Sequence, residues 1–172
     1  MRETASQYTR RLLGYTGKAD PLDLQRTAPK RLAALLDGRS KRELTRRPSA
    51  EGWSVAEIAA HMADAEVAVA WRLRQILSTD GVPIQAYDQD AWAATFDYAH
   101  RDPRQSLELF RVLRENNVAL LRSVARKLWK NHGVHQERGN ESITRVVRMV
   151  AGHDLNHLKQ IERILQAAKT TA

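Results

Sequence analysis

The chain has 172 residues, no cysteine, and a net charge of +8 that is dispersed in short basic doublets among acidic residues, a pattern that argues against nucleic-acid binding. This length supports a single domain, residues 1–172, with a buried core, and the missing cysteines exclude disulfides and thiolate metal sites. No apolar run approaches the roughly 20 residues that span a bilayer, and the N-terminal residues lack the apolar core of a signal peptide, so we expect a cytoplasmic protein without a membrane anchor.

The N-terminal part of the chain predicts helices separated by polar turns. Residues 1–20 are expected to form a short helix or a loose arm. A helix is predicted from Pro21 to about Leu36, because proline fits the first helical turn and a glycine follows the end of the run as a stop signal. Pro29 lies inside it, so either the helix kinks there or its regular part starts there. Residues 39–48 predict a polar connection with about one helical turn.

The next helix has the clearest start in the chain. Ser54 and Glu57 form a capping-box pattern, in which each side chain can bond the backbone N–H of the other. Apolar residues then recur every three or four positions as far as about Ser78, which predicts an amphipathic helix. His61 lies on the apolar stripe of this helix.

A long connection rich in aromatic residues follows, from 79 to 102. Connections of this length in compact domains are commonly binding loops or lids. We therefore take Tyr87 and Trp92 as candidates to line a substrate pocket. The alternative, which is slightly favoured for Trp92, is plain hydrophobic packing of the loop.

The C-terminal half predicts two more helices and a polar loop between them. Asp102 is the N-cap of a helix that begins at Pro103 and is expected to end near Trp129. Residues 131–140 predict a polar loop, and Ser142 caps a last helix that runs to about residue 168. Four long helices without a convincing strand predict an all-α four-helix bundle, whose long connections permit a crossover.

Three histidines carry the strongest chemical signal. His153 and His157 are four residues apart, so their side chains share one face of the last helix, one turn apart. That face is apolar, and a polar group buried without a partner costs a few kcal/mol. His61 supplies a third imidazole if the two helices are neighbours. A single histidine on such a stripe is more often a core residue, but three together favour a catalytic divalent metal with a position left open for water or substrate.

A carboxylate near these histidines is a tentative catalytic residue. Asp64 follows His61 by one turn, and it could orient the His61 ring or bind a water on the metal. The alternative, a surface carboxylate paired with an arginine, is about equally favoured. Asp154 points about 100° away from His153 around the helix axis, so we do not expect it to be a ligand.

Three segments, in order, resemble the DinB/YfiT-like family. Residues 52–64, GWSVAEIAAHMAD, resemble the family's segment with a Gly-Trp-Ser/Thr start and a histidine three residues before an aspartate. Residues 83–92, PIQAYDQDAW, resemble its loop with Ile, Tyr and Trp at fixed spacing, and residues 152–158, GHDLNHL, match its C-terminal H-x-x-x-H motif. The similarity runs in register from about Pro21 to Leu165, and three ordered motifs are much more specific than one.

The resemblance implies a four-helix bundle with up-down-down-up helix order, which is often a homodimer. It also implies a divalent metal, nickel, zinc or iron, held by His61, His153 and His157. Relatives include metal-dependent transferases that use a low-molecular-weight thiol, and members called metal-dependent hydrolases. This chain departs from the pattern at Ala60, where a second histidine is common. That departure keeps the three ligand positions and leaves the substrate open.

Three functions are compatible with these residues, and the first two act on a small-molecule substrate. The first is a transferase, in which a low-molecular-weight thiol cosubstrate occupies the open metal position, loses its proton at neutral pH and attacks an electrophile. The second is a metal-dependent hydrolase using metal-bound water, against which the lack of an assured carboxylate base counts. The third is a non-enzymatic, stress-related binding protein with a structural metal. Structural zinc sites usually have four protein ligands, so three candidates favour an open site.

Overall fold

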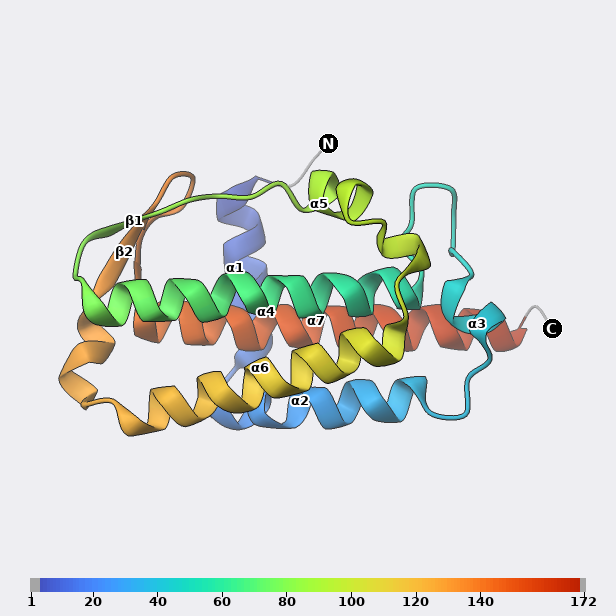
Figure 1. Cartoon of the computed structure of the whole chain (residues 1–172), viewed down its shortest axis with the longest axis horizontal. Helices are drawn as coiled ribbons and strands as arrows, with labels where there is room; N and C mark the ends of the chain where they lie inside the picture. The colour runs from blue at the N-terminus through green and yellow to red at the C-terminus, as the bar shows by residue number, and fades with distance from the viewer. Residues whose placement is uncertain (1–3, 171–172) are drawn as a thin grey trace.

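The computed structural model describes residues 4–170. Its core is formed by four long helices, α2 (Pro21–Leu36), α4 (Val55–Ser78), α6 (Pro103–Ser123) and α7 (Ile143–Thr170). In cross-section α4 contacts α6 and α7, and α2 contacts the same two helices from the other side. Figure 1 shows α2 and α7 running in one direction and α4 and α6 in the other. The predicted four-helix bundle with up-down-down-up order is confirmed.

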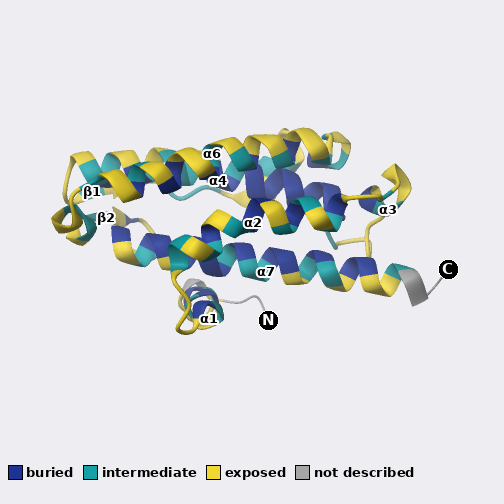
Figure 2. Ribbon diagram, turned by 90° about the horizontal axis from the view of Figure 1, so that it is seen from below, coloured by how far each residue is buried: buried dark blue, intermediate teal, exposed yellow. Residues whose placement is uncertain are grey.

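Of the N-terminal segment predicted as a short helix or a loose arm, the described part forms a helix, and residues 1–3 lie outside the described residues. Helix α1 (Ala5–Thr16) begins with a capping box between Thr4 and Gln7, and it crosses α7 on the outside of the bundle (Figure 2). The crossing is so close that a Cβ atom on Gly152 would stand 2.1 Å from the carbonyl oxygen of Leu12. Only glycine leaves room for this approach of two backbones.

Helix α2 continues through Pro29 because another residue replaces the hydrogen bond that proline cannot make. Proline has no N–H, so the carbonyl oxygen of Gln25, four residues earlier, loses its helical donor. The Nη1 group of Arg114, on α6, donates to that oxygen at 3.2 Å. The Gln25 side chain in turn donates to the carbonyl oxygen of Val147 on α7 at 2.7 Å. Three helices are thus joined at the proline.

The predicted helix starts are confirmed by their capping contacts. The Glu57 N–H donates to Ser54 Oγ at 3.3 Å, and the Ser54 N–H donates to Glu57 Oε2 at 2.8 Å. Asp102 accepts from the N–H of Arg104 at the start of α6. Ser142 Oγ accepts from the N–H of Arg145 at the start of α7. The polar connection before α4 contains the expected short turn, α3 (Lys41–Thr45).

The structure corrects the reading of the two long connections as irregular loops. The first contains β1 (Val82–Ile84), α5 (Gln89–Thr95) and a 3-10 helix, η1 (Tyr98–His100). Helix α6 ends at Ser123 and not near Trp129, and a separate 3-10 helix, η2 (Arg126–Lys130), follows it. The predicted polar loop is a hairpin of β2 (His132–His135) and β3 (Gly139–Ser142).

These strands form a three-stranded sheet in the order β1-β2-β3, so the expectation of no strand is wrong. Strand β1 pairs parallel with β2, with Ile84 opposite His135, and β2 pairs antiparallel with β3. The sheet closes one end of the bundle (Figure 1). Its strands have three or four residues each, and such short runs carry little periodic signal.

The bundle core has an apolar cluster toward each end and a polar layer between them. One cluster packs around Ile58, Phe110 and Ile161, and the other around Leu73, Leu121 and Val147. The polar layer between the two apolar clusters is made of buried polar residues: His61, Glu66, Arg114, Asn117, Asp154 and His157. Among the described helices, none has a stretch long and apolar enough to cross a membrane.

Candidate metal centre

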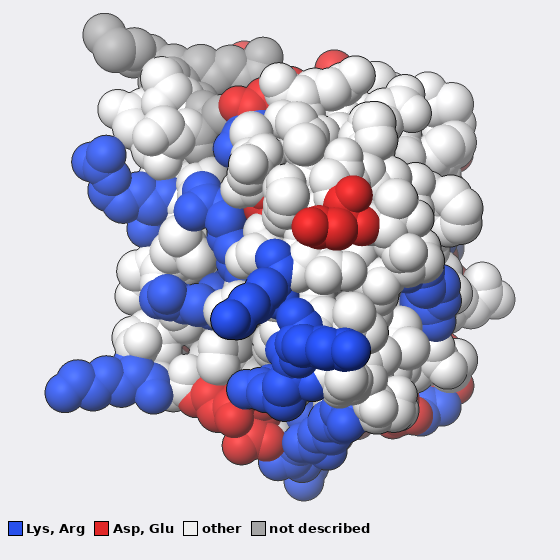
Figure 3. All heavy atoms as spheres, turned by 90° about the vertical axis from the view of Figure 1, so that its left-hand side faces the viewer, with Lys and Arg blue, Asp and Glu red and all other residues white. Residues whose placement is uncertain are grey.

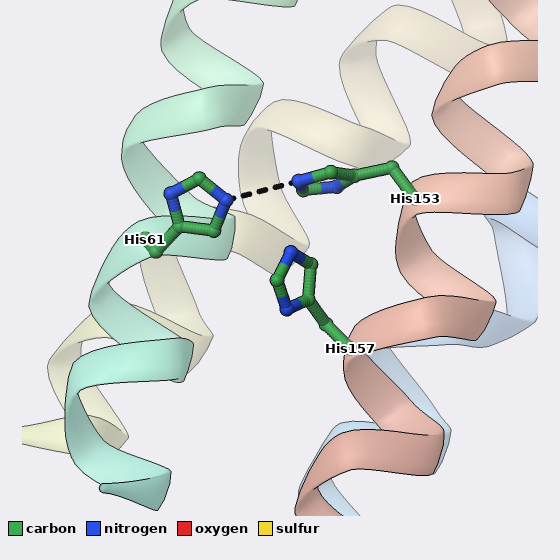
Figure 4. A group of neighbouring side chains, drawn as sticks. All are labelled: His61, His153 and His157. Carbon is green, nitrogen blue, oxygen red and sulfur yellow. Dashed lines mark hydrogen bonds between the residues drawn. The ribbon is translucent and has the colours of Figure 1, made fainter. Parts of the chain in front are cut away.

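The three predicted histidines meet in the polar layer. Helix α4 supplies His61 and α7 supplies His153 and His157, and their imidazole nitrogens lie within 4.8 Å of one another. Figure 4 shows the three rings converging, with Nε2 of His61 and Nε2 of His153 3.0 Å apart. The ring centroids of His153 and His157 are 4.4 Å apart, and that of His61 is 4.9 Å from that of His157. The one-turn spacing on α7 therefore aims both rings at the ring from α4.

The surroundings favour the neutral form of His61 and His157. Burial lowers the pKa of His61 well below 6.5, and the charges of the two other histidines lower it further. Burial and the charge of His153 lower the pKa of His157 to about 3. Nδ1 of His157 donates to Oε1 of Gln160 at 3.0 Å, so its Nε2 keeps a free lone pair. A neutral imidazole with its second nitrogen held in this way is the form that binds metal ions.

The donor set fits a borderline divalent cation. Three imidazole nitrogens suit zinc, nickel or iron, and within the described residues no carboxylate or thiolate joins the cluster. A metal–nitrogen distance of about 2.1 Å keeps two ligating nitrogens within about 4.2 Å of each other. The observed limit of 4.8 Å is therefore within reach of small ring rotations. The side chain of His153 is 16% exposed, which gives the cluster one side near solvent.

A buried ion network lies beside the histidines. Arg114 donates to Glu66 with Nε at 3.0 Å and Nη2 at 2.7 Å, and it also donates to Asp154 with both terminal nitrogens. Asn117 donates to the same glutamate at 2.8 Å. Two carboxylates face one guanidinium, so the layer carries excess negative charge, which favours a cation nearby. Asp154 is directed at the arginine, and its 4.0 Å separation from Nδ1 of His153 exceeds a hydrogen bond.

The structure places Asp64 with an arginine and a tyrosine. Its Oδ2 accepts from Nη1 of Arg101 at 2.8 Å. Burial, together with a hydrogen bond to Asp64, raises the pKa of the Tyr98 hydroxyl. No hydrogen bond joins Asp64 to His61 in the described part of the chain. The predicted orientation of the His61 ring by Asp64 is therefore not what the structure shows. The catalytic role of Asp64 stays a prediction.

Tyr87 and Trp92 stack on each other in the segment between β1 and η1. Their ring centroids are 4.2 Å apart at an angle of 25°, and Trp92 also contacts Phe96. The guanidinium of Arg72, on α4, lies 5.5 Å from the Tyr87 ring centroid. Figure 1 shows this segment running along the outside of α4. The aromatic pair thus forms part of a cover over the helix, and its role as a pocket wall stays a prediction.

Sequence reasoning missed several residues that shape the site. The ring of Trp53 lies 5.1 Å from that of His61 and covers one side of it. Its position, eight residues before His61, offered no sign of this contact. Arg114 stands four residues after the buried Phe110, and this helical spacing is the signal that could have placed its charge in the core.

Comparisons with known proteins show which family this chain belongs to. The family model described as "DinB superfamily" matches residues 24–161. A "Putative metal-dependent hydrolase" of Halalkalibacterium halodurans is 26% identical over 143 residues, 83% of each chain. A protein of the same description from Oceanobacillus iheyensis is 29% identical over 110 residues, 64% of this chain and 63% of its own.

A solved structure shares the fold. YfiT from Bacillus subtilis, described as "a probable metal-dependent hydrolase with an unusual four-helix bundle topology", superposes with a TM-score of 0.82 at 20% identity. The superposition covers 98% of this chain and 93% of that one. The family model spans most of the sequence, including all three histidines. The chain therefore belongs to the DinB superfamily.

Proposed function

We propose that this chain is a divalent-metal-dependent transferase that activates a low-molecular-weight thiol for attack on a small electrophile. The observation that carries the proposal is the set of three convergent histidines without a carboxylate or cysteine ligand among the described residues. Such a set leaves coordination positions for an external nucleophile. A bound divalent ion would lower the pKa of a coordinated thiol and so supply thiolate at neutral pH.

The chain's own residues would bind and position the reactants. His61, His153 and His157 hold the ion. Gln160 fixes the tautomer of His157 through its hydrogen bond to Nδ1, and Trp53 shields His61 from water. The segment that carries Tyr87 would close over the electrophile. The protein has no cysteine of its own, so the nucleophilic sulfur must come from the cosubstrate.

A metal-dependent hydrolase is the second candidate, and the names of the relatives favour it. Water would then take the place of the thiol as nucleophile. Asp64 is the nearest candidate base, but its carboxylate is already bound by Arg101 and Tyr98. Asp154 and Glu66 are bound by Arg114. A non-enzymatic protein with a structural metal is the third candidate, which the three-ligand set disfavours.

The metal site is tested by elemental analysis of purified variants. His153→Ala and His61→Ala should each lose most of the bound metal, because two imidazoles rarely hold a divalent ion alone. His100→Ala is the matched control, since His100 is exposed and pairs with Asp97 on the surface. Equal metal content in wild type and His153→Ala would show that the histidines are not the ligands. The same analysis identifies the ion.

The reaction is tested with the metal-loaded protein. One arm combines a low-molecular-weight thiol with a model epoxide or alkyl halide, and the other supplies esters and amides without thiol. Turnover that requires thiol supports the transferase, and turnover only in the second arm supports the hydrolase. A metal-loaded protein that is inactive in both arms favours the structural metal. Light scattering on the same sample tests the homodimer that the family resemblance implies.

A further inference from the structure

A pocket of about 370 Å³ lies outside the histidine cluster. Its walls come from α1, the turn between β2 and β3, and the first turn of α7. The polar lining includes Thr9 and Arg10 from α1, Glu137 and Arg138 from the turn, and Arg145 from α7. Its volume falls within the range of small-molecule sites.

The pocket wall carries an excess of positive charge. Three of the lining residues are arginines and only one is acidic. Arg138 pairs with Glu141 through Nε at 2.7 Å and Nη2 at 2.9 Å, which leaves its Nη1 group for a ligand. Arg10 and Arg145 form no ion pair with any described residue. Their charge is therefore not neutralised by any carboxylate of the described residues.

Two buried donors in the same wall lack a protein partner. Oγ1 of Thr9 and Nε of Arg145 are among the four buried side-chain polar atoms without a hydrogen bond in the described structure. Thr9 is 5% exposed. An unsatisfied buried polar group costs about 1–3 kcal/mol, so such groups in a pocket indicate a ligand that completes them. A hydroxyl and a guanidinium N–H both donate to the oxygens of an anion.

The positive field extends beyond the pocket. Burial and the charge of Arg138 lower the pKa of Arg72, whose Nη2 donates only to the carbonyl oxygen of Gln85. Arg72 therefore adds a third cation without a carboxylate partner to this part of the molecule. Figure 3, which views the hairpin end, shows Lys and Arg side chains gathered on that face.

We propose that the pocket between α1 and the β2–β3 turn binds the carboxylate or phosphate group of a small molecule. Arg145 and Arg10 supply the charge, and the Thr9 hydroxyl and the Arg145 Nε–H supply buried hydrogen bonds to the anion's oxygens. Binding here does not require the metal, because none of the three histidines lines the pocket. An experiment that disproves anion binding in this pocket would therefore leave the proposed enzymatic function untouched, and the reverse also holds.

The test is calorimetric titration of the metal-free protein at fixed ionic strength, with inorganic phosphate in one arm and succinate in the other. The wild type should show saturable binding of at least one of them. Arg145→Gln should weaken that affinity about tenfold or more, the effect of losing a charge-assisted hydrogen bond. Thr9→Val, which keeps charge and size, should weaken it roughly fivefold. The arm with tighter binding identifies the phosphoryl or carboxylate group.

Arg148→Gln is the matched control. Arg148 lies on α7 one turn after Arg145, is exposed, and is not part of the pocket wall, so its loss removes the same charge without touching the pocket. The affinity of the Arg148→Gln variant for the anion should stay within about twofold of that of the wild type. Equal weakening by Arg145→Gln and Arg148→Gln, or no saturable binding in either arm, would overturn the proposal. Thermal melts check that each variant is folded, and if Arg145→Gln does not fold, Thr9→Val decides.

Discussion

Buried histidines in this chain are neutral for reasons that differ from site to site. In the metal centre, burial and the neighbouring histidines lower the pKa values of His61 and His157. His135, on β2, lies elsewhere: its Nδ1 accepts from the N–H of Glu137 at 3.1 Å, and its Nε2 is buried without a partner. Burial, together with the charges of Arg138 and Arg72, lowers the pKa of His135. Protonation would disrupt the Glu137 contact and bury a charge.

The lowered pKa of His135 therefore predicts that the stability of the fold depends on pH. Its pKa is lower in the folded chain than the unfolded value of about 6.5, so below that pH the unfolded chain binds more protons. The free energy of unfolding then falls as the pH drops below about 6.5, by up to about 1.4 kcal/mol per pH unit. His135→Phe should have a shallower slope in metal-free protein between pH 7.5 and 5. Urea titrations measure this slope, and the exposed-site variant His100→Phe should keep the wild-type slope.

How far the site could be predicted depends on the distance over which each contact acts. His153 and His157 share a face through their spacing alone, and His61 was a candidate because it lies on the apolar stripe of its own helix. The partner of Asp64 is Arg101, 37 positions away, and no local pattern indicates that pairing. His135 stood in a segment predicted to be an exposed loop, and it is buried only because β1 pairs with β2.

At the scale of elements, a buried ion network joins the helices in the middle of the bundle. Arg114 on α6 reaches Glu66 on α4, Asp154 on α7 and the Gln25 carbonyl on α2. All four core helices thus meet at one guanidinium. Pro29 is tolerated in α2 for the same reason, because the arginine satisfies the carbonyl that proline leaves free.

Arg114→Met should therefore destabilise the fold by about 3–5 kcal/mol, because two buried carboxylates lose their countercharge. Arg111→Met is the control on the same helix. Arg111 pairs with Glu108 and Glu115 on the surface, where such pairs contribute at most about 1 kcal/mol. Urea denaturation measures both. Equal losses in the two variants would show that the network contributes no more than a surface ion pair.

The crossing of α1 over α7 gives a second prediction at this scale. Gly152→Ala would place a methyl group 2.1 Å from Leu12 O and 2.7 Å from its carbonyl carbon. Backbone atoms cannot rotate away, so α1 must shift, and we expect a loss of about 1–3 kcal/mol. Gly14→Ala, on α1, meets nothing within 4 Å and should gain up to about 1 kcal/mol of helix stability. Thermal melts that rank the two variants in the opposite order would contradict the observed crossing.

At the scale of the whole molecule, local signals predicted the bundle but not the sheet. Capping residues and apolar periodicity act within a few positions, so the starts of α4, α6 and α7 could be read directly from the sequence. Strand β1 pairs with a strand about 50 residues later, and the composition of β2 and β3 is that of a turn. The end of α6 at Ser123 has no glycine or proline to mark it. Tertiary contacts decide such boundaries.

Charge distribution is the other property that appears only in the folded molecule. Basic residues that are dispersed along the sequence gather on the hairpin end in Figure 3, with acidic residues among them. Several are paired: Arg138 with Glu141, and Arg122 with Asp23 at 3.7 Å. Paired cations have already lost much of the attraction that they would exert on a phosphate backbone.

We therefore expect this face to bind nucleic acid only weakly, despite the net charge of +8. A protein that neutralises several phosphates shows an affinity that falls steeply with salt, with a slope near −0.9 per contact. Fluorescence anisotropy with a labelled duplex, titrated from low to physiological salt, should give weak binding and a slope no steeper than about −2. A slope beyond about −5 would mean that the basic end engages a phosphate backbone through many contacts at once. The face would then be a nucleic-acid-binding surface, and the anion pocket near it would be one of the phosphate-binding positions on that surface.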